Sequence, residues 1–150
     1  MNRQVKPFTL DVVLNYRKRL EDIAQQRFVE AKRIRETIRQ RLIREEDTFS
    51  KLCGESERLQ AEGITVAELI RYEERINYLQ KSIKAIRKTL AEKEEIVATE
   101  QKNLARRSKD RQVMERLKEQ QNSDWSEYLS KKEASMLDEI SVIRHNAEPL

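Results

Sequence analysis

The chain has 150 residues, of which 39% are charged, and its formal net charge at pH 7 is +4. It contains only two glycines, two prolines and 5% aromatic residues. Compact domains use glycine, proline and asparagine in many turns, so this composition leaves material for about one internal turn. High charge also marks disordered chains, but the 37% apolar residues recur here in register over long stretches. The composition excludes a compact globular domain and indicates long helices.

A first helix is expected from about residue 10 to residue 58. Thr9 is a suitable N-cap, and Gly54 is the weak point, because a mid-helix glycine costs about 1 kcal/mol and the helix can fray or end there. The seam of this helix stays on one face only if a four-residue stutter follows Ile38. Its members are Leu10, Val13, Arg17, Leu20, Ala24, Arg27, Ala31, Ile34, Ile38, Leu42, Glu45, Phe49 and Leu52.

A turn at about residues 59–65 and a second helix at about 66–145 follow. Thr65 and Glu68 form a capping box directly after Gly63, a combination typical of a helix start. The second helix carries the clearest coiled-coil pattern of the chain, with alternating steps of three and four residues. Its seam consists of Leu69, Tyr72, Ile76, Leu79, Ile83, Ile86 and Leu90, then, less purely, Lys93, Val97, Glu100, Leu104, Arg107, Arg111 and Met114.

The two seams match when the chain folds back near residue 62. The sequence therefore predicts an all-α fold: a long antiparallel two-helix coiled-coil hairpin, forming a single domain over residues 1–150, with an extended C-terminal helix overhang. In this register the opposed pairs are Leu52–Tyr72, Ile38–Ile86, Ile34–Leu90, Leu20–Leu104 and Leu10–Met114.

Beyond Met114 the second helix has no first helix left to pair with. A solitary helix in water gains nothing from an apolar stripe, so a stripe there implies a partner surface. The structural alternatives are self-association, or residues 1–9 folding back over the overhang. The stripe consists of Trp125, Leu129, Met136, Ile140 and Ile143, with Leu117, Tyr128 and Leu137 beside it.

Charge is distributed in zones along the hairpin. Residues 45–79 have a net charge of −5, residues 1–44 together with 80–114 have +12, and residues 115–150 have −3. The basic zone suggests docking against acidic surfaces, with nucleic acid as a weaker possibility. Because Arg17 would face Arg107 in the predicted register, we expect this half of the hairpin to open more readily than the half near the turn.

No pattern points to catalysis, a cofactor or a metal ion. His145 stands at the end of a helix far from Cys53, and no Cys/His cluster has the spacing of metal ligands. Carboxylates on a solvated helix lack the burial that would tune them for acid catalysis. We expect a protein that is not an enzyme, and the absence of a signal peptide or membrane span predicts a cytoplasmic location.

Two stretches resemble the FliJ family of bacterial flagellar type III export proteins. Residues 8–22, FTLDVVLNYRKRLED, are similar to the opening of that family. Residues 110–119, DRQVMERLKE, followed by Lys132-Glu133 and the LDEI run at 137–140, are similar to its C-terminal signature. The resemblance covers nearly the whole chain.

The resemblance implies a stalk-like role in flagellum biogenesis and motility. Family members are cytoplasmic coiled coils, similar to the central stalk of rotary ATPases, that insert their terminal end into the hexameric flagellar export ATPase and promote its assembly and activity. The other part extends towards the membrane export-gate protein, and members also handle export chaperones. These partners would hold the protein at the inner face of the cell membrane, without a cofactor or small-molecule substrate.

Carried onto this chain, the resemblance places contacts with the ATPase ring on the basic end of the hairpin and on the overhang. The ring residues would be Arg17, Arg107, Arg111, Leu117, Trp125, Leu129, Met136, Ile140 and Ile143. The gate residues would be Arg75, Leu79, Ser82 and Ile86, of which only Leu79 has the expected family residue type.

Three other functions fit the same pattern. The first is the equivalent stalk protein of a virulence type III secretion system, which differs in substrates rather than in physics. The second is a nucleic-acid-binding coiled coil, although the basic residues are interleaved with the heptads rather than gathered beside them. The third is a purely structural coiled coil that dimerises through its overhang.

Overall fold

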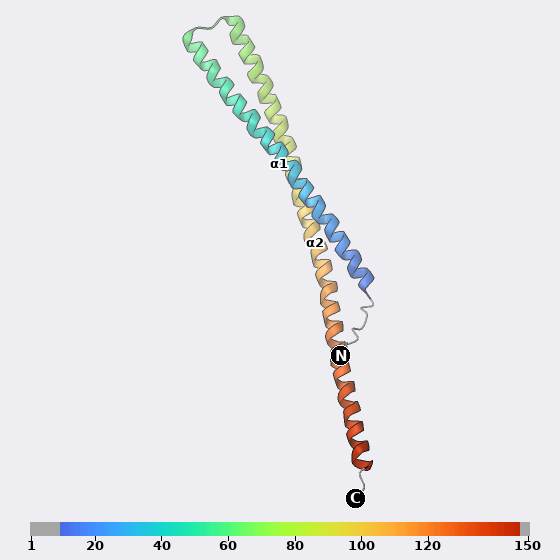
Figure 1. Ribbon diagram of the computed structural model, residues 1–150. Helices are drawn as coiled ribbons and strands as arrows, with labels where there is room; N and C mark the ends of the chain where they lie inside the picture. The colour runs from blue at the N-terminus through green and yellow to red at the C-terminus, as the bar shows by residue number, and fades with distance from the viewer. Residues whose placement is uncertain (1–9, 148–150) are drawn as a thin grey trace. The chain divides into compact units, whose positions relative to one another are not determined.

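The computed structural model describes residues 10–147, which form two α-helices and no strand (Figure 1). Helix α1 spans Asp11–Glu62 and helix α2 spans Val66–Ala147. Contacts pair α1 residues of falling number with α2 residues of rising number, as when Glu55 meets Tyr72 and Glu46 meets Arg87. The predicted all-α antiparallel hairpin is confirmed, whereas the expected cap Thr9 lies outside the described residues.

The turn occupies the three residues between the helices. Gly63 has a φ of 97°, a conformation that glycine adopts without the steric cost of a Cβ atom. Thr65 caps α2, because its Oγ1 accepts a hydrogen bond from the Glu68 backbone N–H at 3.3 Å. Helix α1 passes through Gly54 without a break and ends four residues later than the sequence suggested.

Contacts divide the chain into two units, each built from both helices. We call Met1–Asp22 with Arg106–Leu150 the terminal unit, and Ile23–Ala105 the turn unit. The turn unit holds most of the buried apolar residues. They are Ala24, Ala31, Leu52, Ile83, Ile86 and Val97, and burying a side chain the size of leucine or isoleucine contributes about 1.5–3 kcal/mol.

The seam of α2 is confirmed, because every predicted position is buried or half-buried. The seam predicted for the start of α1 is wrong. Leu10 and Val13 are 42% and 38% exposed, whereas Leu14 is only 2% exposed. From Leu14 onward, buried or half-buried residues recur in unbroken steps of three and four, so no stutter is needed. The observed seam is Leu14, Arg17, Glu21, Ala24, Phe28, Ala31, Arg35, Ile38, Leu42, Glu45, Phe49, Leu52, Ser56 and Leu59.

The register between the helices differs from the predicted one by about one helical turn. Leu14, not Leu10, shares a buried cluster with Met114. Arg17 does not face Arg107 as expected, because its Nη1 donates to the Asp110 backbone carbonyl at 2.9 Å. The prediction failed because it took the residue next to the seam residue at several positions of α1: Leu20 for Glu21, Arg27 for Phe28 and Ile34 for Arg35.

Arg35 is the least satisfied member of the seam. Its Nε is buried and has no hydrogen-bond partner in the described part of the chain. A buried donor without a partner costs about 1–3 kcal/mol. In contrast, the ion pairs Arg87–Glu46 and Arg39–Glu94 lie on exposed edges, where such pairs contribute little.

Replacing Arg35 by Met is expected to stabilise the protein. The variant removes the orphan donor and keeps an unbranched side chain on the seam, so its thermal midpoint should rise by a few degrees in circular dichroism melts. Arg33→Met, which breaks only the exposed pair with Glu30, is the matched control and should change the midpoint little. A lower midpoint for Arg35→Met would show that the guanidinium stabilises the seam.

The two glycines should respond in opposite ways to replacement by alanine. A Cβ at Gly54 meets no atom within 4 Å, so Gly54→Ala should raise the free energy of unfolding by about 1 kcal/mol through helix propensity. Gly63→Ala forces a Cβ into the left-handed region and should lower it by about 1–2 kcal/mol. Urea unfolding followed by circular dichroism measures the free energy of unfolding of both variants. If the two substitutions changed it equally and in the same direction, the assigned turn would be contradicted.

Candidate functional site

A group of charged and polar side chains joins the helices in the terminal unit. We call Glu21, Ser108, Arg111 and Glu115 the charged clasp. Arg111 Nε donates to Glu21 Oε2 at 2.8 Å, and Ser108 Oγ donates to the same oxygen at 2.7 Å. Arg111 Nη1 also donates to Glu115 Oε2 at 2.6 Å. Because the Glu21 and Arg111 side chains are only 20% and 23% exposed, water screens this ion pair less than the pairs on the outer faces.

The clasp keeps both of its central groups charged. Partial burial raises the pKa of Glu21, but the hydrogen bonds from Arg111 and Ser108 and the positive charge of Arg111 outweigh it, so the pKa lies below its ordinary value. The hydrogen bond to Glu21 raises the pKa of Arg111. The carboxylate therefore stays ionised at any pH near neutrality.

The three basic residues assigned to the ATPase ring lie on the α1–α2 seam. Arg17 is bound to the Asp110 carbonyl and Arg111 is held by the clasp, while Arg107 is half-buried. The contacts of Arg17 and Arg111 thus hold the helices together. These two residues have a structural role, whatever they contact outside the chain.

Past the clasp, α2 continues beyond the described start of α1. Lys118 Nζ lies 3.3 Å from the Asp11 carboxylate, and Asp11 is the first residue of α1. Residues 119–147 then extend for about 44 Å at ~1.5 Å per residue. In the terminal unit of Figure 1, this orange-to-red part of α2 runs past the blue start of α1. We call residues 119–147 the C-terminal segment.

One face of the C-terminal segment is apolar and continues the face that buries Met114. Trp125 and Met136 follow Met114 at intervals of eleven residues, which is three turns plus about 20°. Leu129, Ile140 and Ile143 lie within about 80° of the same line. We call this surface, from Trp125 to Ile143, the C-terminal stripe.

The C-terminal stripe is open over most of its length. Leu129 is half-buried, whereas Met136, Ile140 and Ile143 are 54%, 47% and 65% exposed. Leu117, between the clasp and the stripe, is 47% exposed. Trp125 is half-buried and stacks on Tyr128, with ring centroids 5.4 Å apart and planes 24° from parallel.

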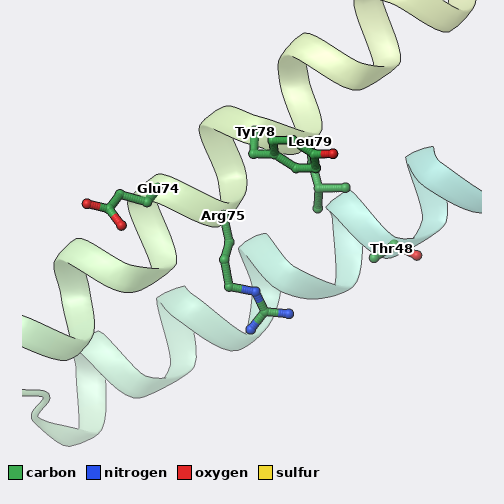
Figure 2. Close-up of a pocket in the computed structure, with 5 residues that line it drawn as sticks. All are labelled: Thr48, Glu74, Arg75, Tyr78 and Leu79. Carbon is green, nitrogen blue, oxygen red and sulfur yellow. The ribbon is translucent and has the colours of Figure 1, made fainter.

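The four residues assigned to the export gate line two open grooves of the turn unit. Arg75 and Leu79 line a groove of about 320 Å³ with Thr48, and Figure 2 shows both reaching from α2 towards α1. Ser82 and Ile86 line a second groove of about 240 Å³. Ile86 is only 6% exposed, so it belongs mainly to the core.

Sequence reasoning missed several residues of these surfaces. Glu21 and Ser108 were not singled out, although Glu21 stands on the unbroken spacing that starts at Leu14. Tyr78, which is 73% exposed, lines the groove with Arg75 and was passed over because it stands off the α2 seam. Within residues 10–147, no cluster of histidine, cysteine or carboxylate groups has an arrangement that could hold a metal ion.

A comparison with protein-family models identifies the family of this chain. The model described as Flagellar FliJ protein matches residues 6–149, almost the entire chain. The chain belongs to this family. Membership in the FliJ family makes it a protein of flagellar export, and the family is known as a non-enzymatic component of that apparatus.

Other comparisons add no relative to the FliJ match. No curated protein and no solved structure matches the chain. Neither helix, over the residues described, contains an apolar run of the length that a bilayer requires.

Glu21→Gln tests the clasp through the pH dependence of stability. Because the folded pKa of Glu21 lies below its unfolded value, its contribution is present above the unfolded pKa, near 4.5, and is lost as the pH falls through the folded pKa. The variant should lose about 1 kcal/mol at pH 7 and show a flatter decline between pH 5 and pH 3. Urea titrations at several pH values measure this, with Glu57→Gln as the exposed control.

Proposed function

We propose that this FliJ-family protein is a stalk-like coiled coil that binds the hexameric export ATPase through its C-terminal stripe. The observation that carries the proposal is the open apolar face of residues 119–147. Exposed apolar faces of this length mark interaction sites, because an isolated helix gains no stability from them. Membership in a flagellar export family supplies the class of partner.

The charge zones of the sequence support a partner with both apolar and charged surface. The stripe lies in the zone of net charge −3, while the neighbouring hairpin belongs to the zone of net charge +12. A binding site that accepts the stripe and the neighbouring end of the hairpin must be apolar along one side. It must also carry acidic groups towards the hairpin and basic groups towards the C-terminus. A closed ring that surrounds the helix offers such surfaces at different depths.

We assign the contact with the membrane export gate to the turn unit. Arg75 and Leu79 are accessible in the same groove, with the 73% exposed Tyr78 beside them. Ser82 stands one turn further along α2, and Ile86 takes part only if the helices separate. Export chaperones are the third class of partner proposed. Through these partners the protein acts in the cytoplasm at the inner face of the cell membrane, without catalysis of its own.

The same stripe and charge zones would serve the stalk of a virulence type III system, but the match to a flagellar family favours the flagellar one. Nucleic acid is disfavoured by the clasp. Arg111 and Arg17 are already held by groups of the hairpin, which lowers the number of cations open to phosphate.

Paired substitutions on the C-terminal segment test ring binding. Ile140→Ser with Ile143→Ser removes two exposed apolar side chains from the stripe and should weaken binding to the export ATPase of the same cell at least tenfold. The matched control, Leu137→Ser with Val142→Ser, removes side chains 63% and 58% exposed that lie off the stripe. Co-purification and ATPase stimulation are the measurements.

The two double variants are read together. Loss of binding in the stripe variant with retention in the control supports the proposal. If both variants kept full binding, the proposal would be contradicted. If both lost binding equally, general surface hydrophobicity rather than this face would drive the association. Circular dichroism confirms that each variant keeps the helical content of the parent chain.

A further inference from the structure

One edge of the C-terminal stripe contains two charges of opposite sign. Lys132 follows Met114 by eighteen residues, about five full turns, and Glu139 follows by about seven turns. Both side chains therefore lie on the apolar face. Neither makes an ion pair or hydrogen bond within residues 10–147, in contrast to Lys131, which pairs with Glu127 off the stripe.

Any partner that covers this face must neutralise both charges. Burying an ionised side chain without a counter-charge is costly, so the partner needs an acidic group near Lys132 and a basic group near Glu139. The chain itself carries these two groups, seven residues apart, on a surface of the right shape. A second copy is thus a complementary partner.

The stripe is close to symmetric about Met136. Leu129 and Ile143 each stand seven residues from it, and Lys132 and Ile140 each stand four residues from it. If a second helix crosses in the opposite direction with the two Met136 side chains together, Leu129 packs against Ile143. Lys132 then lies beside Glu139 of the other copy, and this happens twice because the arrangement has twofold symmetry.

We propose that the C-terminal segments of two copies of this chain pair antiparallel through the stripe, centred on Met136 and joined by two Lys132–Glu139 ion pairs between copies. The same charges favour the antiparallel pair over a parallel one, which would set Lys132 against Lys132 and Glu139 against Glu139. This inference uses only the isolated chain and does not rest on the proposed function.

Self-pairing and ring binding use the same apolar face. The paired state therefore covers the stripe when no ring is present, and the two associations are mutually exclusive. A ring must bind the face tightly enough to displace the second copy.

Charge exchange in the full-length chain tests the pairing. Lys132→Glu and Glu139→Lys, made singly, each replace two attractions with two repulsions, so each should raise the dimer dissociation constant about tenfold. The double variant K132E/E139K restores opposite charges in both pairs and should dimerise as the parent does. Sedimentation equilibrium over a concentration series gives the dissociation constants.

A mixture of the two single variants provides the sharpest comparison. One then carries Glu at both positions and the other Lys at both, so they should form a mixed dimer although each self-associates weakly. Lys131→Glu, a charge change just off the stripe, is the matched control and should dimerise as the parent does. A parent chain that stays monomeric throughout the series, or single variants that dimerise as well as the parent, would overturn the proposal.

Discussion

The structure depends on one seam of buried side chains between α1 and α2, and α2 extends beyond the end of this seam. Burial along this seam is the main stabilising term available to a chain with so few aromatic residues and no second layer. Pairing ends where Asp11 meets Lys118, and α2 continues to Ala147. Over the described residues, this additional length carries an apolar face that α1 does not cover.

Polar groups within the seam have different effects according to how well they are satisfied. Glu21 and Arg111 are each bound by more than one partner, so their burial is compensated and they tie the helices together in one register. Arg35 has a buried donor with no partner and weakens its layer. The same class of residue therefore fixes the alignment in the terminal unit and costs stability in the turn unit.

Much of the fold could be predicted from the sequence. The seam of α2 was visible because its first seven positions are apolar or aromatic and evenly spaced, and the start of α2 was visible in the Thr65 capping box. The register was missed because Leu10, Val13 and Leu14 are all apolar, so hydrophobicity alone does not decide which of them lies on the seam. Contacts across the hairpin, such as Glu21 with Arg111, show that charged residues complete the spacing.

The candidate surfaces were predictable in position but not in detail. Spacing alone places Met136, Ile140 and Ile143 on one face, because a regular helix fixes the direction of each side chain. Whether a side chain is free depends on neighbours that sequence does not reveal. Arg111 looked like a cation open to a partner and is instead enclosed by Glu21 and Glu115.

The spacing of the apolar residues in the C-terminal stripe has a consequence for handedness. Steps of three and four, averaging 3.5 residues per turn, make paired helices wind around each other to the left, whereas an eleven-residue period of about 3.67 favours a nearly straight or slightly right-handed course. In the C-terminal segment the stripe keeps the first period, because Leu129, Met136 and Ile143 are seven residues apart. A helix that pairs with the C-terminal segment between Leu129 and Ile143 therefore winds to the left, as α1 does along the hairpin.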